Sequence, residues 1–199
     1  MQGLTPEDLL PLEEYLPRRR ELFVANQRYV DLYRRVRIGP TATLIFENRQ
    51  TLWFRLHEIF RIARLTEPIL VARELALYNG LLPGRDQLHA VLLLDLDENN
   101  LLTELAGWRD LRGDEIRLHL GDRSLAANLY TARPEDRCFG AAQWIQFALD
   151  PASLAALADF DERVYLSIRR EGYAHASACL TGDVRRSLLE DLDMSARAA

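Results

Sequence analysis

The stretch that decides the fold is EIRLHLGDRSLAANLY, residues 115–130. Its first half alternates between apolar and polar positions, and the apolar positions are Ile116, Leu118 and Leu120. Such a period of two is typical of a strand that buries one face. Gly121-Asp122 separates this run from a second β-type run at 124–130, and a Gly-Asp pair between two such runs favours a tight turn. The stretch therefore predicts an antiparallel hairpin.

The C-terminal half continues in the same pattern. Runs at 163–169 and 173–180 flank Glu171-Gly172 and predict a second hairpin. The segment 88–95 is apolar on both faces, which is typical of a central strand, and 143–149 has the pattern of a further strand. These strands follow one another without regular helical crossovers. We therefore expect an antiparallel sheet rather than a doubly wound parallel sheet.

The N-terminal half shows helical periodicity instead. The expected helices are 18–38, which ends before Gly39-Pro40, then 49–64, and a third that starts at Glu67-Pro68 and stops before Leu81. Pro11 and Pro17 limit the segment 6–16 to short turns, because proline breaks a helix interior. Asn48 can cap the second helix, and 41–47 is a short β-type run.

These patterns together predict an α+β fold in which a helical N-terminal half packs on a C-terminal antiparallel β-sheet. The length of 199 residues suits a single domain that spans 1–199. Within it we expect a mainly helical part at 1–85, an antiparallel β part at 86–180 and a closing helix at 181–194.

Composition excludes several classes of function. The formal net charge of -5 argues against general nucleic-acid binding, which needs a basic field. All 25 basic residues are arginine, which a GC-rich genome explains more simply than phosphate recognition does. Cys138 and Cys179 form no CxxC pair, so neither a disulfide scaffold nor a thiolate metal site is expected. The sequence shows no signal peptide and no apolar run long enough to span a bilayer, so we expect a cytoplasmic protein that does not bind membranes.

One stripe of the expected helix 49–64 carries the densest polar chemistry. Its residues are Arg49, Trp53, His57, then Phe60 or Arg61, and Arg64, and Glu58 lies one turn from Arg61. A pocket there would offer two guanidinium groups to an anion and a His–Glu pair for proton transfer. The alternative is a solvated face whose charges pair at i,i+3 spacing, and this alternative is the commoner one.

Histidine supplies no metal-binding motif. The four histidines are His57, His89, His119 and His175, and no two of them stand at i,i+3 or i,i+4 spacing. Three of them lie on separate expected strands, where side-chain parity would let them share one face of a sheet. The phosphate-binding patterns GxxxxGK and GxGxxG are also absent. The sequence therefore assigns no metal and leaves the cofactor unknown.

A further set of segments spans nearly the whole chain in order. They are the run from Asp8 to Tyr15, Gly39-Pro40 with the strand that leads to Arg49, Glu58 with Arg61, Glu74 with Tyr78-Asn79, Leu82-Pro83, and the run from Ser187 to Asp191. Together these segments resemble a bacterial family known as a domain of unknown function. Genes of that family often lie beside those for rubrerythrin and a heterodisulfide-reductase-like iron–sulfur protein. The resemblance thus implies a setting in redox or iron metabolism by association, and it implies no established activity.

The resemblance also implies one polar set as a ligand-binding site. Its members are Glu47, Arg49, Glu58, Arg61, Glu74, Tyr78 and Asn79. The sequence departs from the family where Gln143 and Gln146 replace a usual His and Arg, and where Ala63 replaces an acid. If the family site uses those groups, this member lacks that part of the site.

Two hypotheses about function follow. The first is a non-catalytic accessory or binding protein in redox or iron metabolism, with rubrerythrin or an iron–sulfur oxidoreductase as its partner. The alternative is a small enzyme with a Glu/Arg/Tyr pocket centred on Glu58. In that case Glu47, Arg49, Arg61 and Tyr78 would line the same pocket. The sequence leaves open the ligand, the reaction and whether the chain forms a homo-oligomer.

Overall fold

A computed structural model describes residues 2–130 and 142–197 of the chain. The helices are α1 (Leu12–Tyr33), α2 (Arg49–Ala63), α3 (Pro68–Asn79), α4 (Leu101–Trp108), α5 (Pro151–Ala158) and α6 (Gly182–Arg197). The strands are β1 (Arg35–Ile38), β2 (Ala42–Glu47), β3 (Gln87–Leu94), β4 (Ile116–Leu120), β5 (Arg123–Ala126), β6 (Asn128–Tyr130), β7 (Ala142–Ala148), β8 (Val164–Arg170) and β9 (Tyr173–Ala176). Cys138 lies outside the described residues.

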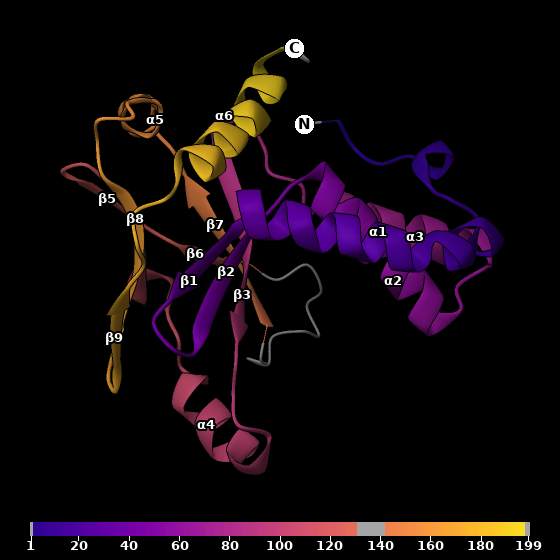
Figure 1. Cartoon of the computed structure of the whole chain (residues 1–199), viewed down its shortest axis with the longest axis horizontal. Coiled ribbons are helices and arrows are strands. Elements are labelled where there is room, and N and C mark those ends of the chain that lie inside the picture. The colour runs from indigo at the N-terminus through magenta and orange to yellow at the C-terminus, as the bar shows by residue number, and fades with distance from the viewer. Residues whose placement is uncertain (1, 131–141, 198–199) are drawn as a thin grey trace.

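The strands form two antiparallel sheets, which lie on the same side of the molecule in Figure 1. Sheet A has the strand order β1-β2-β3-β7-β6, and sheet B has the order β5-β4-β8-β9. Strand β3 is central in sheet A, between β2 and β7, as its two apolar faces predict. The antiparallel arrangement and the α+β class predicted from the sequence are therefore confirmed, but the strands form two sheets where one was predicted.

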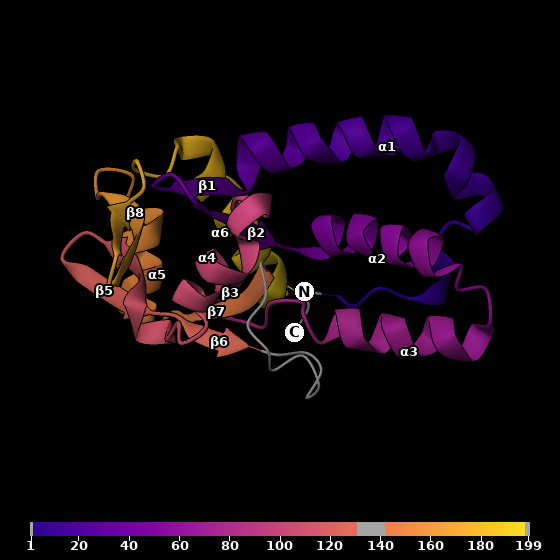
Figure 2. The same cartoon turned by 90° about the horizontal axis from the view of Figure 1, so that it is seen from below.

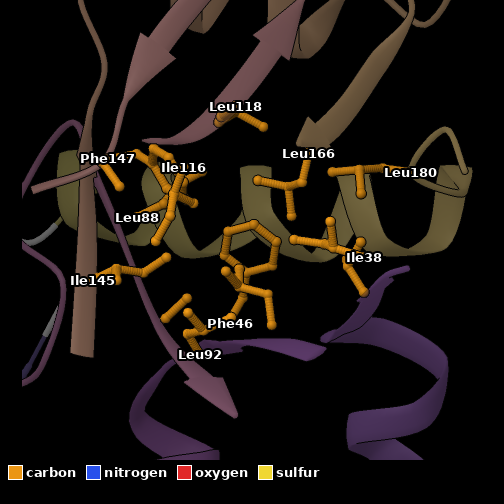
Figure 3. Close-up of a cluster of buried hydrophobic side chains, with 14 of the residues drawn as sticks. Ile38, Phe46, Leu88, Leu92, Ile116, Leu118, Ile145, Phe147, Leu166 and Leu180 are labelled. Carbon is orange, nitrogen blue, oxygen red and sulfur yellow. The ribbon is translucent and has the colours of Figure 1, made fainter. Parts of the chain in front are cut away.

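The main hydrophobic core lies between the inner faces of the two sheets (Figure 3). Alternation along each strand supplies one row of apolar side chains to this core. The fully buried residues labelled there include Phe46 and Leu92 from sheet A and Leu118 and Leu166 from sheet B. Helix α6 closes the core with Val184, Leu188 and Leu192.

Helices α1, α2 and α3 lie side by side and extend away from the sheets (Figure 2). The outer face of sheet A contacts this layer through a small cluster that includes Ile45, Val91 and Val30, the last of which belongs to α1. Sheet A is therefore covered on both faces near β2 and β3. Among the described residues, no helix is long and apolar enough to cross a membrane.

Helix α2 begins where the sequence predicts. The Asn48 side chain accepts hydrogen bonds from the backbone N–H groups of Gln50 and Thr51, at 3.0 and 3.1 Å. The hydroxyl of Thr51 in turn accepts a bond from the Asn48 backbone N–H, at 2.9 Å. This reciprocal cap satisfies donors that have no partner inside the helix. It also fixes the direction in which the chain leaves β2.

Two parts of the predicted organisation are wrong. The helical half and the sheet are not successive parts of the chain, because β1 and β2 of the N-terminal half belong to sheet A and interleave with the helices. The segment 35–38, predicted as the end of a helix, is strand β1, whose pairing with β2 buries Val36 and Ile38 in the core. The helical periodicity of 18–38 is weak at its C-terminal end, and the pairing with β2 determines the structure of this segment.

Helix α1 also starts earlier than predicted. It begins at Leu12 and continues through Pro17, which was expected to exclude a helix from this segment. Figure 2 shows α1 bending in its first turns. A bend moves the proline ring away from the preceding carbonyl and exposes that carbonyl to water, which lowers the cost of a proline inside a helix.

Both predicted hairpins are present. Strands β4 and β5 pair across Gly121-Asp122, and β8 and β9 pair across Glu171-Gly172. The run 124–130, however, divides at Ala127 between β5 of sheet B and β6 of sheet A. The backbone N–H of Ala127 is bonded to the carbonyl oxygens of Gly113 and Ile116 at this point, so the chain can pass from one sheet to the other.

Gly39, in the turn between β1 and β2, allows a test of this packing. Its φ is +70°, and a Cβ there would lie 2.5 Å from Cγ of His175. We expect Gly39→Ala to lower the free energy of unfolding by about 2–3 kcal/mol, from left-handed strain plus the clash. Gly172→Ala is the matched control, because its φ is +75° and its Cβ would meet no atom within 4 Å. Equal losses of stability for the two variants in urea unfolding would contradict the close packing at Gly39.

Candidate functional site

A cavity of about 210 Å³ lies between α1, the β1–β2 strands and α2. We call it the Glu47 chamber, and its lining residues are Asn26, Gln27, Val30, Arg35, Ile45, Glu47, Thr51, Phe54, Arg55 and Glu58. Glu47 ends the outer row of β2, so the pleat turns its side chain toward the helices rather than into the core. The Asn48 cap then places α2, with Arg55, over the same carboxylate.

The Glu47–Arg55 ion pair is the electrostatic centre of this chamber. The Glu47 side chain is 0% exposed, and Nη2 of Arg55 donates to its Oε1 at 2.5 Å. The Arg55 guanidinium also lies over the Trp144 ring, 5.2 Å from the centroid. Burial lowers the pKa of Arg55, but the Glu47 carboxylate more than offsets this, so the net shift is upward. Arg55 therefore stays charged in this position.

The pair uses only one atom of each partner. Within the described residues, Oε2 of Glu47 and Nε of Arg55 are buried and have no hydrogen-bond partner. Oδ1 of Asn26, on the α1 side of the chamber, is also buried and has no hydrogen-bond partner in the described part of the chain. Buried polar atoms in native proteins are normally bonded to protein or water, so three such atoms around one cavity are unusual.

Glu58 lies at the edge of the chamber and is held by three side chains. Its carboxylate accepts hydrogen bonds from the Tyr15 hydroxyl at 2.8 Å, from Arg19 at 2.9 Å and from Arg61 at 3.0 Å. The hydrogen bonds from Arg19, against the effect of burial and with help from Arg61 and Tyr15, lower the pKa of Glu58 to about 2. Burial and the Glu58 carboxylate raise the pKa of Tyr15. Glu58 is thus a fixed anion.

This fixed anion predicts a dependence of stability on pH. The pKa of Glu58 is about 2 in the folded chain, below its ordinary 4.5, so its stabilising effect is complete above pH 4.5. That effect disappears as the pH falls from 4.5 towards 2. We expect the gap in free energy of unfolding between the wild type and Glu58→Gln to shrink over this range in urea titrations. A gap that stays constant from pH 6 to pH 2.5 would contradict the assignment.

His57, which is buried beside Glu58 on α2, has a structural role. Nδ1 of His57 lies 2.8 Å from the Trp53 carbonyl, and Nε2 accepts the Leu10 N–H at 3.0 Å. Nδ1 must therefore carry the proton of a neutral ring. Burial lowers the pKa of His57, which favours the same form. Its imidazole is consequently occupied on both sides and does not act as a free base for the neighbouring Glu58.

A row of polar residues crosses the outer face of sheet A from the chamber. Glu47 pairs with His89, and His89 pairs with Gln146. Nδ1 of His89 bonds the Leu81 carbonyl at 2.8 Å, so Nε2 accepts from the Gln146 amide at 2.9 Å. Burial lowers the pKa of His89. Gln146 was expected to differ from the family pattern, and its amide here completes the bonding of a neutral histidine.

A second cavity, of about 770 Å³, lies where α1, α2 and α6 meet. We call it the Arg34 groove, and its lining residues are Tyr29, Tyr33, Arg34, Asn48, Arg49, Gln50, Trp53, Asp183, Arg186, Ser187, Glu190 and Asp191. The Arg34 guanidinium is buried and donates to the Asp191 carboxylate, to the Ser187 hydroxyl at 2.6 Å and to the Tyr29 hydroxyl at 2.7 Å. Burial raises the pKa of Asp191 and outweighs the opposing effect of Arg34. The Arg34 guanidinium in the wall of the groove is therefore hydrogen-bonded to side chains of α1 and α6.

The structure brings together only part of the polar set expected from the sequence. Glu47 and Glu58 line the Glu47 chamber, and Arg61 holds Glu58. Arg49 lies instead in the Arg34 groove, where it pairs with Asp8 at 2.6 Å. Asn79 bonds the backbone N–H and carbonyl of Leu4 at 2.7 and 2.8 Å, which is a structural role.

Tyr78 and Glu74 complete that set on α3. Tyr78 packs against the cluster of Leu4, Leu56, Phe60 and Leu75. Glu74 is partly buried on the same helix and does not line the Glu47 chamber. Asn26, Arg55 and Arg34 were not predicted as site residues. Arg55 lies eight residues after Glu47, with the Asn48 cap between them, and this spacing is the sequence feature that could have suggested their ion pair.

The three strand histidines do not form a metal site in the described part of the chain. His89 belongs to sheet A, whereas His119 and His175 belong to sheet B. No group of three or more His, Cys, Asp or Glu side chains among residues 2–130 and 142–197 could hold a metal ion. Nε2 of His119 instead lies 2.8 Å from the Ser167 hydroxyl.

Comparison with known proteins gives a family and a fold. The profile of DUF3501, described as a protein of unknown function, matches residues 3–192. A similar solved structure is a novel protein of unknown function from Burkholderia pseudomallei K96243, with 26% sequence identity and a TM-score of 0.87. The alignment covers 96% of this chain and 100% of that chain. No curated protein matches.

Proposed function

The chain belongs to the DUF3501 family, and we propose that it is a non-catalytic accessory or binding protein in redox or iron metabolism. The observation that supports binding over catalysis is the state of Glu58. This carboxylate has a pKa of about 2 and is bonded by Tyr15, Arg19 and Arg61, so it is a poor proton acceptor near neutral pH. A carboxylate fixed in this way stabilises the local structure and does not exchange protons near neutral pH.

A small enzyme centred on Glu58 is the second candidate. It requires Arg49 and Tyr78 beside Glu58, with a proton-transfer group in reach. Arg49 lines the Arg34 groove and Tyr78 packs in a separate hydrophobic cluster, so the geometry supports this candidate less. His57, the nearest imidazole in sequence, has both ring nitrogens engaged.

The redox or iron setting is supported by the resemblance to a family whose genes lie beside those for rubrerythrin and an iron–sulfur oxidoreductase. The proposed partners, rubrerythrin and an iron–sulfur oxidoreductase, are themselves iron proteins. The function of the chain would then be to bind that partner or to deliver a ligand to it.

The test is affinity purification of a chromosomally tagged copy from the native host, with an untagged strain as control. We expect rubrerythrin or the iron–sulfur oxidoreductase to co-purify, and we expect the reciprocal tag on that partner to retain this chain. Absence of both proteins from both purifications, although both are expressed, would refute the accessory role.

A further inference from the structure

The outer face of α1 carries apolar side chains that no described element covers. In Figure 2, α1 is the outermost helix of its layer, and α2 lies on its inner side. Val24 is 60% exposed and Leu32 is 46% exposed. A shallow groove on this face is lined by α1 residues alone, namely Pro17, Arg20, Glu21, Val24, Ala25, Arg28, Tyr29, Leu32 and Tyr33. An exposed apolar surface rimmed by polar residues is typical of a contact between proteins.

The exposed residues of this face lie on one side of the helix and include charges without a counter-charge. Each residue of an α-helix is rotated by about 100° from the one before it, so exposed positions of α1 share an arc of about 100°. Within residues 2–130 and 142–197, α1 residues pair as Arg19–Glu58 and Asp31–Arg35, but neither Glu21 nor Arg28 forms an ion pair. The residues that share the arc are Glu14, Pro17, Glu21, Val24, Ala25, Arg28 and Leu32.

The order of these residues is complementary to itself when the direction of the helix is reversed. Glu21 and Arg28 lie equally far from a point between Val24 and Ala25, on either side of it. In two antiparallel helices related by a two-fold axis at that point, equidistant positions lie at the same level. The Glu21 carboxylate of each copy therefore faces the Arg28 guanidinium of the other copy, and the two valines meet beside the axis.

The outer positions of the face follow the same rule. Pro17 and Leu32 are equidistant from the axis, so an apolar residue faces an apolar residue there. Glu14 is equidistant with Arg35, the first residue of β1, so the reversal again sets an acid opposite an arginine. All four of these residues are exposed. Charge and apolar character are thus complementary along the whole face.

We propose that α1 docks antiparallel on α1 of a second copy of this chain, around a two-fold axis between Val24 and Ala25, which goes beyond the accessory role above. A second copy fits this face better than a different protein does, because the complementarity is reciprocal, as a two-fold interface requires. Only one helix of 22 residues from each copy takes part. The interface is therefore small, and we expect a reversible dimer with a Kd on the order of micromolar.

The test is sedimentation velocity of the full chain over a range of concentrations around that Kd. We expect the wild type to show a monomer–dimer equilibrium. Glu21→Arg and Arg28→Glu should each weaken the association by about tenfold, because like charges then face each other at both reciprocal contacts. An equimolar mixture of these two variants should associate like the wild type, because opposite charges face each other again in the mixed dimer.

Two further variants test the position of the interface. Val24→Glu should remove the dimer, because it places two carboxylates beside the axis. Leu102→Glu is the matched control on α4, where Leu102 is 83% exposed, and it should leave the dimer intact. Both positions are on the surface, so urea unfolding should show nearly wild-type stability for both variants.

Three results would overturn the proposal. The first is a monomer at every concentration, which would leave the outer face of α1 to a different protein. The second is a dimer that Val24→Glu does not weaken, because the interface would then lie elsewhere. The third is a mixture of Glu21→Arg and Arg28→Glu that associates no better than either variant alone, which would exclude the antiparallel arrangement. The partner purification above tests the accessory role separately and does not depend on these results.

Discussion

Arg34→Met is expected to lower the free energy of unfolding by about 3–5 kcal/mol, one of the two largest effects in the molecule. Arg34 is 1% exposed, although it sits at the C-terminal end of α1. Its guanidinium joins α1 to α6 through Asp191 and Ser187. Methionine keeps most of the volume but leaves the Asp191 carboxylate buried without its cation. The measurement is urea unfolding at pH 7.

A double-mutant cycle separates the buried charge from the packing. Asp191→Asn alone should also destabilise the chain, because it leaves the Arg34 cation without its counter-charge. The double variant should lose clearly less stability than the two single losses added together, because neither charge is then left alone. Strict additivity, or a loss below about 1 kcal/mol for Arg34→Met, would contradict the assigned network.

Phe46→Ala is expected to cost about 3–5 kcal/mol for a different reason. Phe46 is 0% exposed and lies at the centre of the core between the two sheets (Figure 3). Its removal opens a cavity that neighbours on two rigid sheets cannot fill. Thermal and urea unfolding both measure the loss.

Phe46→Leu is the matched control, because it keeps an apolar side chain of intermediate size at the same position. It should retain more than half of the stability that Phe46→Ala loses. If Phe46→Ala cost less than about 1 kcal/mol, the sheets would not be packed as tightly as described.

Much of the fold could be predicted because its signals are local. The Gly121-Asp122 and Glu171-Gly172 turns each join two runs with a period of two, and both hairpins follow. Asn48 is a strong cap directly before an apolar stripe, and α2 begins there. In each case the decisive residues lie within a few positions of one another.

The parts that could not be predicted depend on distant contacts. Strand β1 forms because β2 pairs with it, and its short alternation also fits the end of a helix. The division of 124–130 between two sheets depends on the carbonyl of Gly113. The alternation of apolar and polar residues within a strand does not indicate which of two sheets the strand joins.

The candidate site shows the same limit. The resemblance pointed to Glu47 and Glu58, and the polar stripe of helix 49–64 also singled out Glu58; both residues line one chamber. Asn26 reaches that chamber from α1, twenty-one residues before Glu47, and Arg34 meets Asp191 at a separation of 157 residues. Arg34 stands in a run of charged residues that is typical of a solvated face. Only the fold shows that its side chain is buried.

The most direct test of the accessory role is native mass spectrometry of the tagged chain purified from its native host without chelators. We expect a species whose mass equals that of the chain plus rubrerythrin or the iron–sulfur oxidoreductase. A spectrum that holds only the bare chain or a simple multiple of it, from cells that express both partners, would contradict the account.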